Sequence, residues 1–235
     1  MLDEGMRSRR AILKSAGALA GMALVQGCAR TIPAARPLAD AKPALPPLPT
    51  PWHNAPARVA TRSAPAGVRP ALFERAMAAL DRHGSRIKRR DMIVIADFDR
   101  QSADSRFQFI HLPSGTVSAM RVAHGSGSDP AHSGRLHHFS NTPGSEATCE
   151  GAFLTDDYYV GQHGRSQRLV GLDHTNNNAF DRAIVIHGAW YANPEMIAQH
   201  GKLGRSQGCF AVAEGDLARV FALAGQGSMI YAGKA

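Results

Sequence analysis

A cysteine and a histidine, two residue types that together perform covalent catalysis, lie 22 residues apart late in the chain. His187 ends the apolar run 182–186, and Cys209 ends the glycine-containing segment 204–209. A thiol attacks a carbonyl group as the thiolate, and a neighbouring imidazole commonly accepts its proton. The pair therefore predicts cysteine-dependent acyl chemistry, with Cys209 as the nucleophile and His187 as the base.

Glycines next to both residues fit this chemistry. Gly188 follows His187, and Gly208 precedes Cys209. A residue without a side chain lets a backbone N–H approach the oxyanion that develops on an attacked carbonyl. Spacing alone does not select this pair, because the chain contains 11 histidines.

The other histidines raise a second possibility, a metal-dependent hydrolase, since imidazole is the commonest metal ligand. The candidates in the central region are His124, His132, His137, His138 and His163. The chain lacks the His-Glu-x-x-His and Cys-x-x-Cys patterns of zinc sites, and adjacent histidines point apart if they lie on a strand. We therefore predict no metal and no cofactor.

Hydrophobic periodicity indicates the elements that position these residues. Phe73, Met77 and Leu80 form one apolar stripe, so 69–83 is expected to be a helix that Gly84 ends. Strands are expected at 92–98, 106–112, 116–123, 168–172, 183–187, 209–213 and 228–231, with a second helix at 216–224. The strands 106–112 and 116–123 predict a hairpin, and 125–148 predicts functional loops. The expected domain is mainly β with a few helices.

The N-terminal 28 residues predict an export signal. Arg9-Arg10 precedes a short apolar segment from Ser15 to Val25, a pattern typical of twin-arginine signals. Cys28 follows Gln26-Gly27 and is a candidate for lipidation. The apolar segment is shorter than the ~18 residues that a membrane span needs. We expect an exported protein of the periplasm or cell envelope, with Cys28 as its candidate membrane anchor.

Charge and proline content divide the rest of the chain into a linker, 29–68, and a catalytic domain, 69–235. Ten of the 14 prolines fall between Thr31 and Pro70, which favours an extended spacer. Residues 29–90 carry 12 Lys/Arg against 3 Asp/Glu, whereas residues 91–235 carry 11 against 14. The net charge of +8 therefore comes from the N-terminal part, and we predict no nucleic-acid partner.

Taken together, these motifs resemble the YkuD-type L,D-transpeptidase catalytic domain, in its murein L,D-transpeptidase branch. The His-Gly and Ser-x-Gly-Cys motifs of that family are matched by 187–188 and 206–209. The similarity also includes, in the expected order, 95–98, 122–128, 139–145, 159–164, 169–172 and 182–190. It covers about residues 69–231, which is nearly the whole predicted domain.

The resemblance implies a β-sandwich-like enzyme that acts on peptidoglycan stem peptides. Cys209 would attack the carbonyl of the L-centre of diaminopimelate in a tetrapeptide stem and release D-Ala. His187 would carry the proton from the thiol to the leaving amine, oriented by the carbonyl of Gly188. Backbone N–H groups around Gly208 and Cys209 would form the oxyanion hole. An amine of a second stem, or water, would then resolve the thioester.

Substrate contacts are expected from five residues in the matched motifs: Arg205, Ser206, His124, Ser140 and Asn141. For Arg205 the alternatives are binding of a substrate carboxylate, which suits its guanidinium, and a surface ion pair. Gln207 departs from the family, many members of which have histidine there. Cys149 stands where a small hydroxyl residue is expected, and it is either a buried free thiol or a disulfide partner of Cys209.

Two alternative functions stay open. One is an L,D-carboxypeptidase or endopeptidase that hydrolyses the same acyl-enzyme, because the sequence does not identify the nucleophile that resolves it. The other is a peptidoglycan-binding lipoprotein without catalysis, which the intact His187 and Cys209 pair disfavours.

Overall fold

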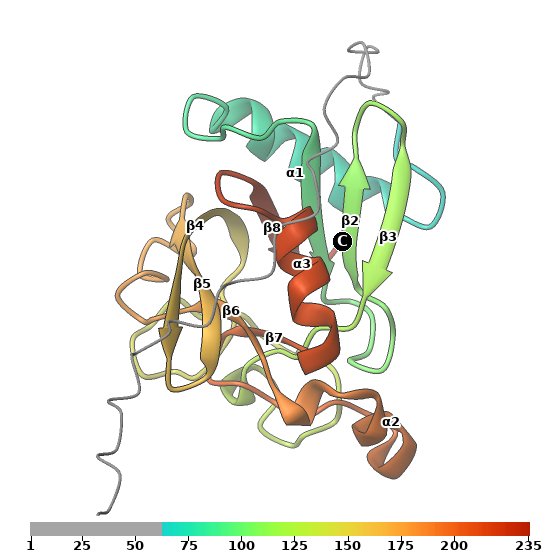
Figure 1. Ribbon diagram of the computed structural model, residues 1–235, viewed down its shortest axis with the longest axis vertical. Helices are drawn as coiled ribbons and strands as arrows, with labels where there is room; N and C mark the ends of the chain where they lie inside the picture. The colour runs from blue at the N-terminus through green and yellow to red at the C-terminus, as the bar shows by residue number, and fades with distance from the viewer. Residues whose placement is uncertain (1–62) are drawn as a thin grey trace, which may run out of the picture. The chain divides into compact units, whose positions relative to one another are not determined.

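The computed structural model describes residues 63–235 (Figure 1). The predicted export signal, with Cys28, and most of the predicted linker lie outside the described residues, so those predictions stay predictions. In the part that is described, no helix is both long and apolar enough to cross a membrane.

Residues 63–235 contain eight strands, three α-helices and three short 3-10 helices. The α-helices are α1 (Pro70–Arg82), α2 (Pro194–His200) and α3 (Leu217–Leu223), and the short 3-10 helices are η1 (Ser126–Ser128), η2 (Trp190–Ala192) and η3 (Glu214–Asp216). The strands are β1 (Met92–Asp97), β2 (Phe107–His111), β3 (Thr116–Met120), β4 (Gly151–Gly161), β5 (Gly164–Gly171), β6 (Val185–Gly188), β7 (Phe210–Val212) and β8 (Met229–Gly233). This confirms the prediction of a mainly β domain with a few helices.

The strands form one mixed sheet in the order β3-β2-β1-β8-β4-β5-β6-β7. Two neighbouring pairs are parallel, β1 with β8 and β6 with β7, and the other pairs are antiparallel. The predicted hairpin is confirmed, since β2 and β3 pair antiparallel with His111 opposite Thr116. The parallel pairing of β6 with β7 places His187 beside Ala211 and Gly188 beside Val212.

The core explains why every residue of β1 is buried. Alternate side chains point to opposite faces of a strand. Ile93 and Ile95 pack with α1, whereas Val94 packs in a second cluster that includes residues of α3. The two helices therefore cover opposite faces of the sheet (Figure 1).

The sheet also curls, which brings distant strands onto one core. Phe107 of β2 and Phe210 of β7 lie near opposite ends of the strand order, yet their rings stack with centroids 6.1 Å apart. Phe153 of β4 contacts Phe210 edge-on at 5.3 Å. Aromatic pairs at such distances add about 0.5–1.5 kcal/mol beyond the burial of their surface. This packing fixes the position of β7, which begins immediately after Cys209.

Most predicted elements are confirmed within a few residues, including both helices. Two elements were not predicted, the strand β4 and the helix α2. The segment 125–148 is largely loop, as expected, apart from η1.

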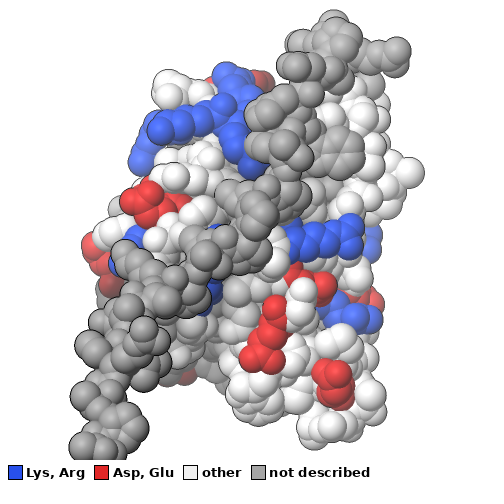
Figure 2. All heavy atoms as spheres, in the orientation of Figure 1, with Lys and Arg blue, Asp and Glu red and all other residues white. Residues whose placement is uncertain are grey.

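Charged side chains on the described surface are mixed in sign. Figure 2 shows Lys and Arg in separate groups on one face, with Asp and Glu side chains between them. This agrees with the sequence counts for residues 91–235, in which acidic residues slightly outnumber basic ones.

Candidate active site

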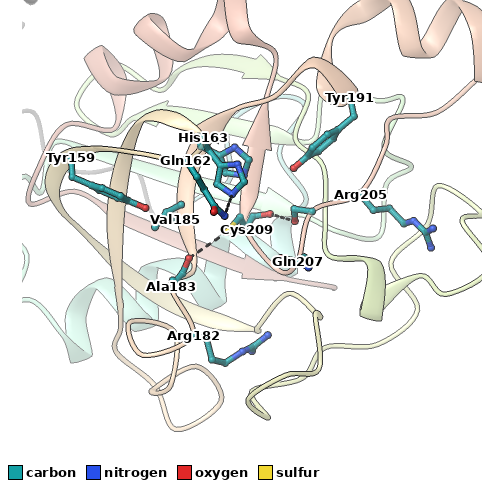
Figure 3. Close-up of a pocket in the computed structure, with 12 residues that line it drawn as sticks. Tyr159, Gln162, His163, Arg182, Ala183, Val185, Tyr191, Arg205, Gln207 and Cys209 are labelled. Carbon is teal, nitrogen blue, oxygen red and sulfur yellow. Dashed lines mark hydrogen bonds between the residues drawn. The ribbon is translucent and has the colours of Figure 1, made fainter. Parts of the chain in front are cut away.

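His187 and Cys209 line the same pocket, which has a volume of about 470 Å³ (Figure 3). Two more residues predicted to act at the site, Arg205 and Ser206, also line it. The strands β6 and β7 are parallel neighbours, and His187 pairs with Ala211, two residues after Cys209. Side chains two residues apart on a strand point to the same face, so His187 lies on the same side of the sheet as Cys209. The structure therefore brings the predicted pair together through the sheet.

The turn that carries the nucleophile requires glycine at position 208. Gly208 has φ +109°, a conformation that residues with a side chain rarely adopt. A Cβ atom there would lie 2.7 Å from both the backbone oxygen of Ala147 and the Cδ1 atom of Ile184. Conformation and space therefore both exclude a side chain.

Ser206 holds this turn together. Its hydroxyl donates a 2.7 Å hydrogen bond to the carbonyl oxygen of Cys209 and accepts a 3.2 Å hydrogen bond from the backbone N–H of Gly208. That N–H was predicted to help form the oxyanion hole. In this structure it is bonded to Ser206, so Ser206 stabilises the turn in addition to lining the pocket, and the role of the Gly208 N–H in an oxyanion hole stays a prediction.

Backbone hydrogen bonds from the segment 123–126 support the turn that carries Cys209. The backbone N–H of Ser206 donates to the carbonyl oxygen of His124 at 2.9 Å, and the N–H of Ser126 donates to the carbonyl oxygen of Ser206 at 2.7 Å. The N–H of Ala123 bonds to the carbonyl oxygen of Ala211 in β7 at 2.8 Å. The loops expected to be functional therefore act here as a backbone support for Cys209.

His187 is held in one tautomer. Its Nδ1 atom lies 3.0 Å from the carbonyl oxygen of Gly188, and because a carbonyl oxygen only accepts, Nδ1 carries the proton. Nε2 is then free to accept a proton. Burial lowers the pKa of His187, the positive charge of His163 lowers it further, and the hydrogen bond to Gly188 opposes both effects. The imidazole is therefore kept neutral and ready to act as a base.

The thiol of Cys209 is also neutral at rest. Burial raises its pKa, which a backbone hydrogen bond with Val185 and the charge of Arg182 only partly offset. Its sulfur lies 3.6 Å from the carbonyl oxygen of Ala183, a residue with φ +53°. A neutral thiol and a neutral imidazole in one pocket favour proton transfer during attack over a permanent ion pair.

Several residues that line the pocket were not assigned a role from the sequence: Tyr159, Gln162, His163, Arg182, Val185 and Tyr191. Arg182 is anchored by hydrogen bonds to the carbonyl oxygens of Ser140, at 2.7 Å, and Ala147, at 2.6 Å. Burial raises the pKa of Tyr191 to about 12, with a contribution from Cys209. Arg182 and Tyr191 both fall within the matched stretches or next to them, but no spacing pattern marked them.

Arg205 links the pocket to a neighbouring loop. Its guanidinium donates hydrogen bonds to the carbonyl oxygens of Asp129 and Pro130, the latter at 3.1 Å. In Figure 3 its side chain points away from Cys209. It lines the pocket while its Nη1 atom binds these two backbone oxygens, so binding of a substrate carboxylate by its other donors stays a prediction.

His124 is not a substrate contact, because it is only 1% exposed and lies outside the pocket lining. Arg106 donates to its Nδ1 at 2.6 Å, so the proton is on Nε2, which faces Asp129 Oδ2 at 3.4 Å. Burial and the charge of Arg106 lower the pKa of His124 to about 3. Its role is to support the loop whose backbone binds Ser206.

Ser140 and Asn141 also lie outside the pocket lining. The carbonyl oxygen of Ser140 anchors Arg182, and the amide of Asn141 donates to Asn177 Oδ1 at 2.7 Å and to the carbonyl oxygen of His174 at 3.1 Å. These residues position the loops around the pocket, and contact of either with substrate stays a prediction.

Cys149 and Cys209 are both free thiols, so the structure contains the buried free thiol and not the disulfide alternative. Burial raises the pKa of Cys149, although its sulfur lies 2.8 Å from Nη1 of Arg182. The described residues contain no group of three His, Cys, Asp or Glu side chains arranged to hold a metal ion.

A second pocket, of about 390 Å³, adjoins the first and shares Arg182 and Gln207 with it. Its lining includes two acidic residues, Glu146 and Asp181. Glu146 accepts hydrogen bonds from Ser126, at 2.6 Å, and from Gln207, at 3.1 Å. The two pockets therefore differ in charge, because the one with Cys209 is lined by two arginines and by none of the acidic residues of the described chain.

Comparison with known proteins identifies this domain. The family model of the L,D-transpeptidase catalytic domain matches residues 65–232. Similar solved structures include an L,D-transpeptidase from Mycobacterium smegmatis, with 14% identity and a TM-score of 0.37 over 61% of this chain and 58% of that chain. Another is L,D-transpeptidase 1 from Mycobacterium tuberculosis, with 15% identity and a TM-score of 0.34 over 60% of each chain. A third is the helical cell shape determining protein Pgp2 from Campylobacter jejuni, with 12% identity and a TM-score of 0.39 over 61% of this chain and 47% of that chain. The match thus spans between about half and three fifths of those chains. No curated protein matches the sequence.

Proposed function

Because this chain belongs to the L,D-transpeptidase catalytic domain family, we propose that it is a cysteine-dependent L,D-transpeptidase that acts on peptidoglycan stem peptides. The observation that carries the proposal is the presence of Cys209 and His187 in one pocket, with the proton of His187 held on Nδ1 by Gly188.

In the first half-reaction, Cys209 attacks the carbonyl of the L-centre of diaminopimelate. The thiol proton passes to Nε2 of His187 as the S–C bond forms, so no thiolate needs to persist at rest. The tetrahedral intermediate collapses to a thioester, the C–N bond to D-Ala breaks, and His187 returns the proton to the leaving amine. We propose the backbone N–H of Cys209 as an oxyanion donor, since that of Gly208 is bonded to Ser206.

In the second half-reaction, an amine of a second stem attacks the thioester, and His187 accepts a proton from that amine. The new C–N bond replaces the S–C bond, and the proton returns to the sulfur of Cys209. Hydrolysis follows the same steps with water in place of the amine. Transfer and hydrolysis therefore differ only in which nucleophile reaches the acyl-enzyme.

The charges of the two adjoining pockets support this assignment. Arg182 and Arg205 give the pocket of Cys209 a positive character, which suits the carboxylates of a stem peptide. The adjoining pocket carries Glu146 and Asp181, which suit the ammonium group of an acceptor. We propose that the donor occupies the first pocket and that the acceptor approaches through the second.

The direct test is to incubate the full-length protein with a disaccharide-tetrapeptide and identify the products by mass spectrometry. Release of D-Ala with a cross-linked dimer supports transfer. Release of D-Ala with only the tripeptide product supports the carboxypeptidase alternative, and cleavage of an added cross-linked dimer supports the endopeptidase. Binding of the muropeptide without any product supports a non-catalytic binding protein.

We also propose that the protein is exported and anchored through Cys28, on the sequence pattern of residues 1–28. Replacement of Arg9 and Arg10 by lysine is expected to leave precursor in the cytoplasm. Cys28→Ser is expected to move the protein from the membrane fraction to the soluble periplasmic fraction. Unchanged processing, or unchanged fractionation, contradicts the respective proposal.

A further inference from the structure

A second histidine lies flat against the proposed general base. The rings of His163 and His187 stack with centroids 4.4 Å apart and planes inclined by 20° (Figure 3 shows His163 beside Cys209). The edge of Tyr191 approaches His187 at 6.5 Å with the planes at 76°. One face of the base is therefore covered by His163, and its remaining surroundings include Tyr191.

The backbone of the β4–β5 hairpin places His163 there. Gln162 and His163 form a two-residue loop between the paired glycines Gly161 and Gly164, and Gly164 has φ +70°. Ser166, early in β5, pairs directly with His187 in β6. His163 therefore lies three residues before Ser166, the β5 residue that pairs with His187. Its side chain stacks on the ring of His187.

His163 is itself held in an orientation that suits stacking. Gln162 Nε2 lies 3.2 Å from His163 Nε2, and because an amide nitrogen only donates, His163 accepts at that atom. In this arrangement a proton of His163 is on Nδ1. In the stack, His187 donates to the carbonyl oxygen of Gly188 and His163 accepts from Gln162.

We infer that His163 is a positioning residue for the reaction: its ring covers one face of His187, holds the plane of that imidazole against the Gly188 carbonyl, and limits access of water to the base. The inference rests on the proposed function, in which His187 moves the proton. His163 does not touch the reacting atoms in this role.

Two consequences distinguish this role from simple packing. Cover by His163 contributes to the burial that lowers the pKa of His187, and its positive charge, when present, acts in the same direction. Removal of the ring is therefore expected to make the base easier to protonate, so that activity is lost at a higher pH on the acid side. The other titratable or charged groups that line the pocket are Tyr159, Arg182, Tyr191, Arg205 and Cys209.

The variants separate the cover from the charge. His163→Ala and His163→Gln remove the ring, whereas His163→Phe keeps a flat ring and removes any charge. Val160→Ala is the matched control, since Val160 lies on the same hairpin and is 80% exposed. His163 is exposed, so none of these changes removes a core contact, and unfolding temperatures are expected to stay close to that of the unaltered protein.

The measurement is the rate at which iodoacetamide alkylates Cys209 as a function of pH, followed on the full-length protein by mass spectrometry of the Cys209 peptide. This reaction needs no peptidoglycan, so its result does not depend on whether the proposed substrate is correct. Where turnover is measurable, the ringless variants are expected to lose less than the ~10²-fold expected for loss of the base itself.

The expected result is an acid-side midpoint that moves up, toward the ordinary histidine value of ~6.5, in the two ringless variants. The shift in His163→Phe is expected to be smaller, and that in Val160→Ala absent. Ringless variants with the midpoint of the unaltered protein overturn the inference. A shift in His163→Phe as large as in His163→Ala overturns the claim that cover by the ring is the cause.

Discussion

The Nδ1 atom of His187 lies 3.0 Å from the carbonyl oxygen of Gly188, a contact that leaves Nε2 as the proton acceptor of this imidazole. We expect His187→Ala to lower kcat by about 10²–10⁴-fold, the usual contribution of positioned acid–base catalysis. The measurement is D-Ala release from tetrapeptide stems. His174→Ala, at an exposed histidine, is the matched control and should retain turnover. A His187→Ala protein with unchanged kcat would remove His187 from the mechanism.

Substitutions of the two cysteines in the described domain are expected to have opposite effects on D-Ala release. Cys209→Ala is expected to abolish D-Ala release while leaving the unfolding transition in place, because the side chain lies at a pocket and not in the aromatic core. Cys149→Ser should keep most activity, since a hydroxyl can still accept from Arg182, which lies 2.8 Å from the sulfur. Mass spectrometry of the acyl-enzyme should locate the adduct on the Cys209 peptide. Turnover by Cys209→Ala at the rate of the unaltered protein defeats the proposed mechanism.

Gly208→Ala tests the shape of the nucleophile turn. The positive φ alone is expected to cost about 1–3 kcal/mol of unfolding free energy, before the contacts with Ala147 and Ile184 are counted. Activity should fall further than stability explains, because the turn must shift to accommodate the methyl group. Urea denaturation and kcat measured on the same sample separate the two effects. Gly144→Ala is a control, since Gly144 also has a positive φ but no atom within 4 Å of its Cβ position.

The charge of the second pocket predicts an effect on transfer but not on acylation. Asp181→Asn removes an exposed carboxylate and is expected to lower the ratio of transfer to hydrolysis by about two- to five-fold, the range of an exposed charge pair. D-Ala release should be unchanged. Glu195→Gln, at an exposed position in α2, controls for loss of negative charge elsewhere. Equal product ratios in Asp181→Asn and the unaltered protein contradict the proposed path of the acceptor.

The buried side chains of Arg106, His124 and Asp129, which are linked by hydrogen bonds, predict that the fold loses stability in acid. The folded-state pKa of His124 is lowered to about 3, so the unfolded chain binds an extra proton below the ordinary value of ~6.5. The contribution of neutral His124 to the free energy of unfolding is fully present above pH ~6.5 and is lost progressively as the pH falls toward 3. Its total is on the order of a few kcal/mol. Burial raises the pKa of Asp129, but hydrogen bonds from Ser133 and Gly134 outweigh this effect and lower the pKa to about 2. Protonation of Asp129 therefore reduces the stability of the fold only at lower pH.

Urea midpoints measured between pH 7 and pH 4 test this contribution. The unaltered protein should lose stability over this interval more steeply than His124→Gln, in which the titrating ring is absent. Parallel pH profiles for the two proteins contradict a role for His124 in the acid response.

The helices and strands with a regular hydrophobic periodicity were predictable from the sequence. The two elements that were missed lack this periodicity for physical reasons. β4 contains Asp156-Asp157 and a register shift between Thr155 and Tyr158, so its alternation breaks in the middle of the strand. α2 has seven residues and none of them is buried, so it carries no apolar stripe. Neither element leaves a periodic signal.

The placement of Cys209 and His187 in one pocket was predictable because the proposed chemistry depends on residue type and on local glycines. The surroundings were not. Arg182 reaches the pocket through bonds to carbonyl oxygens more than 30 residues earlier in the chain, and His163 reaches it through the pairing of β5 with β6. Conversely, His124 belongs to a matched motif, yet its side chain is turned into the core by Arg106. A motif fixes which residues are present, whereas backbone pairing decides which of them face the substrate.

The position of β8 constrains how this domain can be made. Its five residues lie between β1 and β4, so β8 joins β3-β2-β1 to β4-β5-β6-β7 in the order of the sheet. During synthesis, β1 and β4 emerge from the ribosome long before Met229 and must wait without their shared partner. Closure of the sheet thus depends on contacts between segments more than 130 residues apart in sequence, which slow folding. A ribosome-bound chain halted before residue 229 should remain open to proteases.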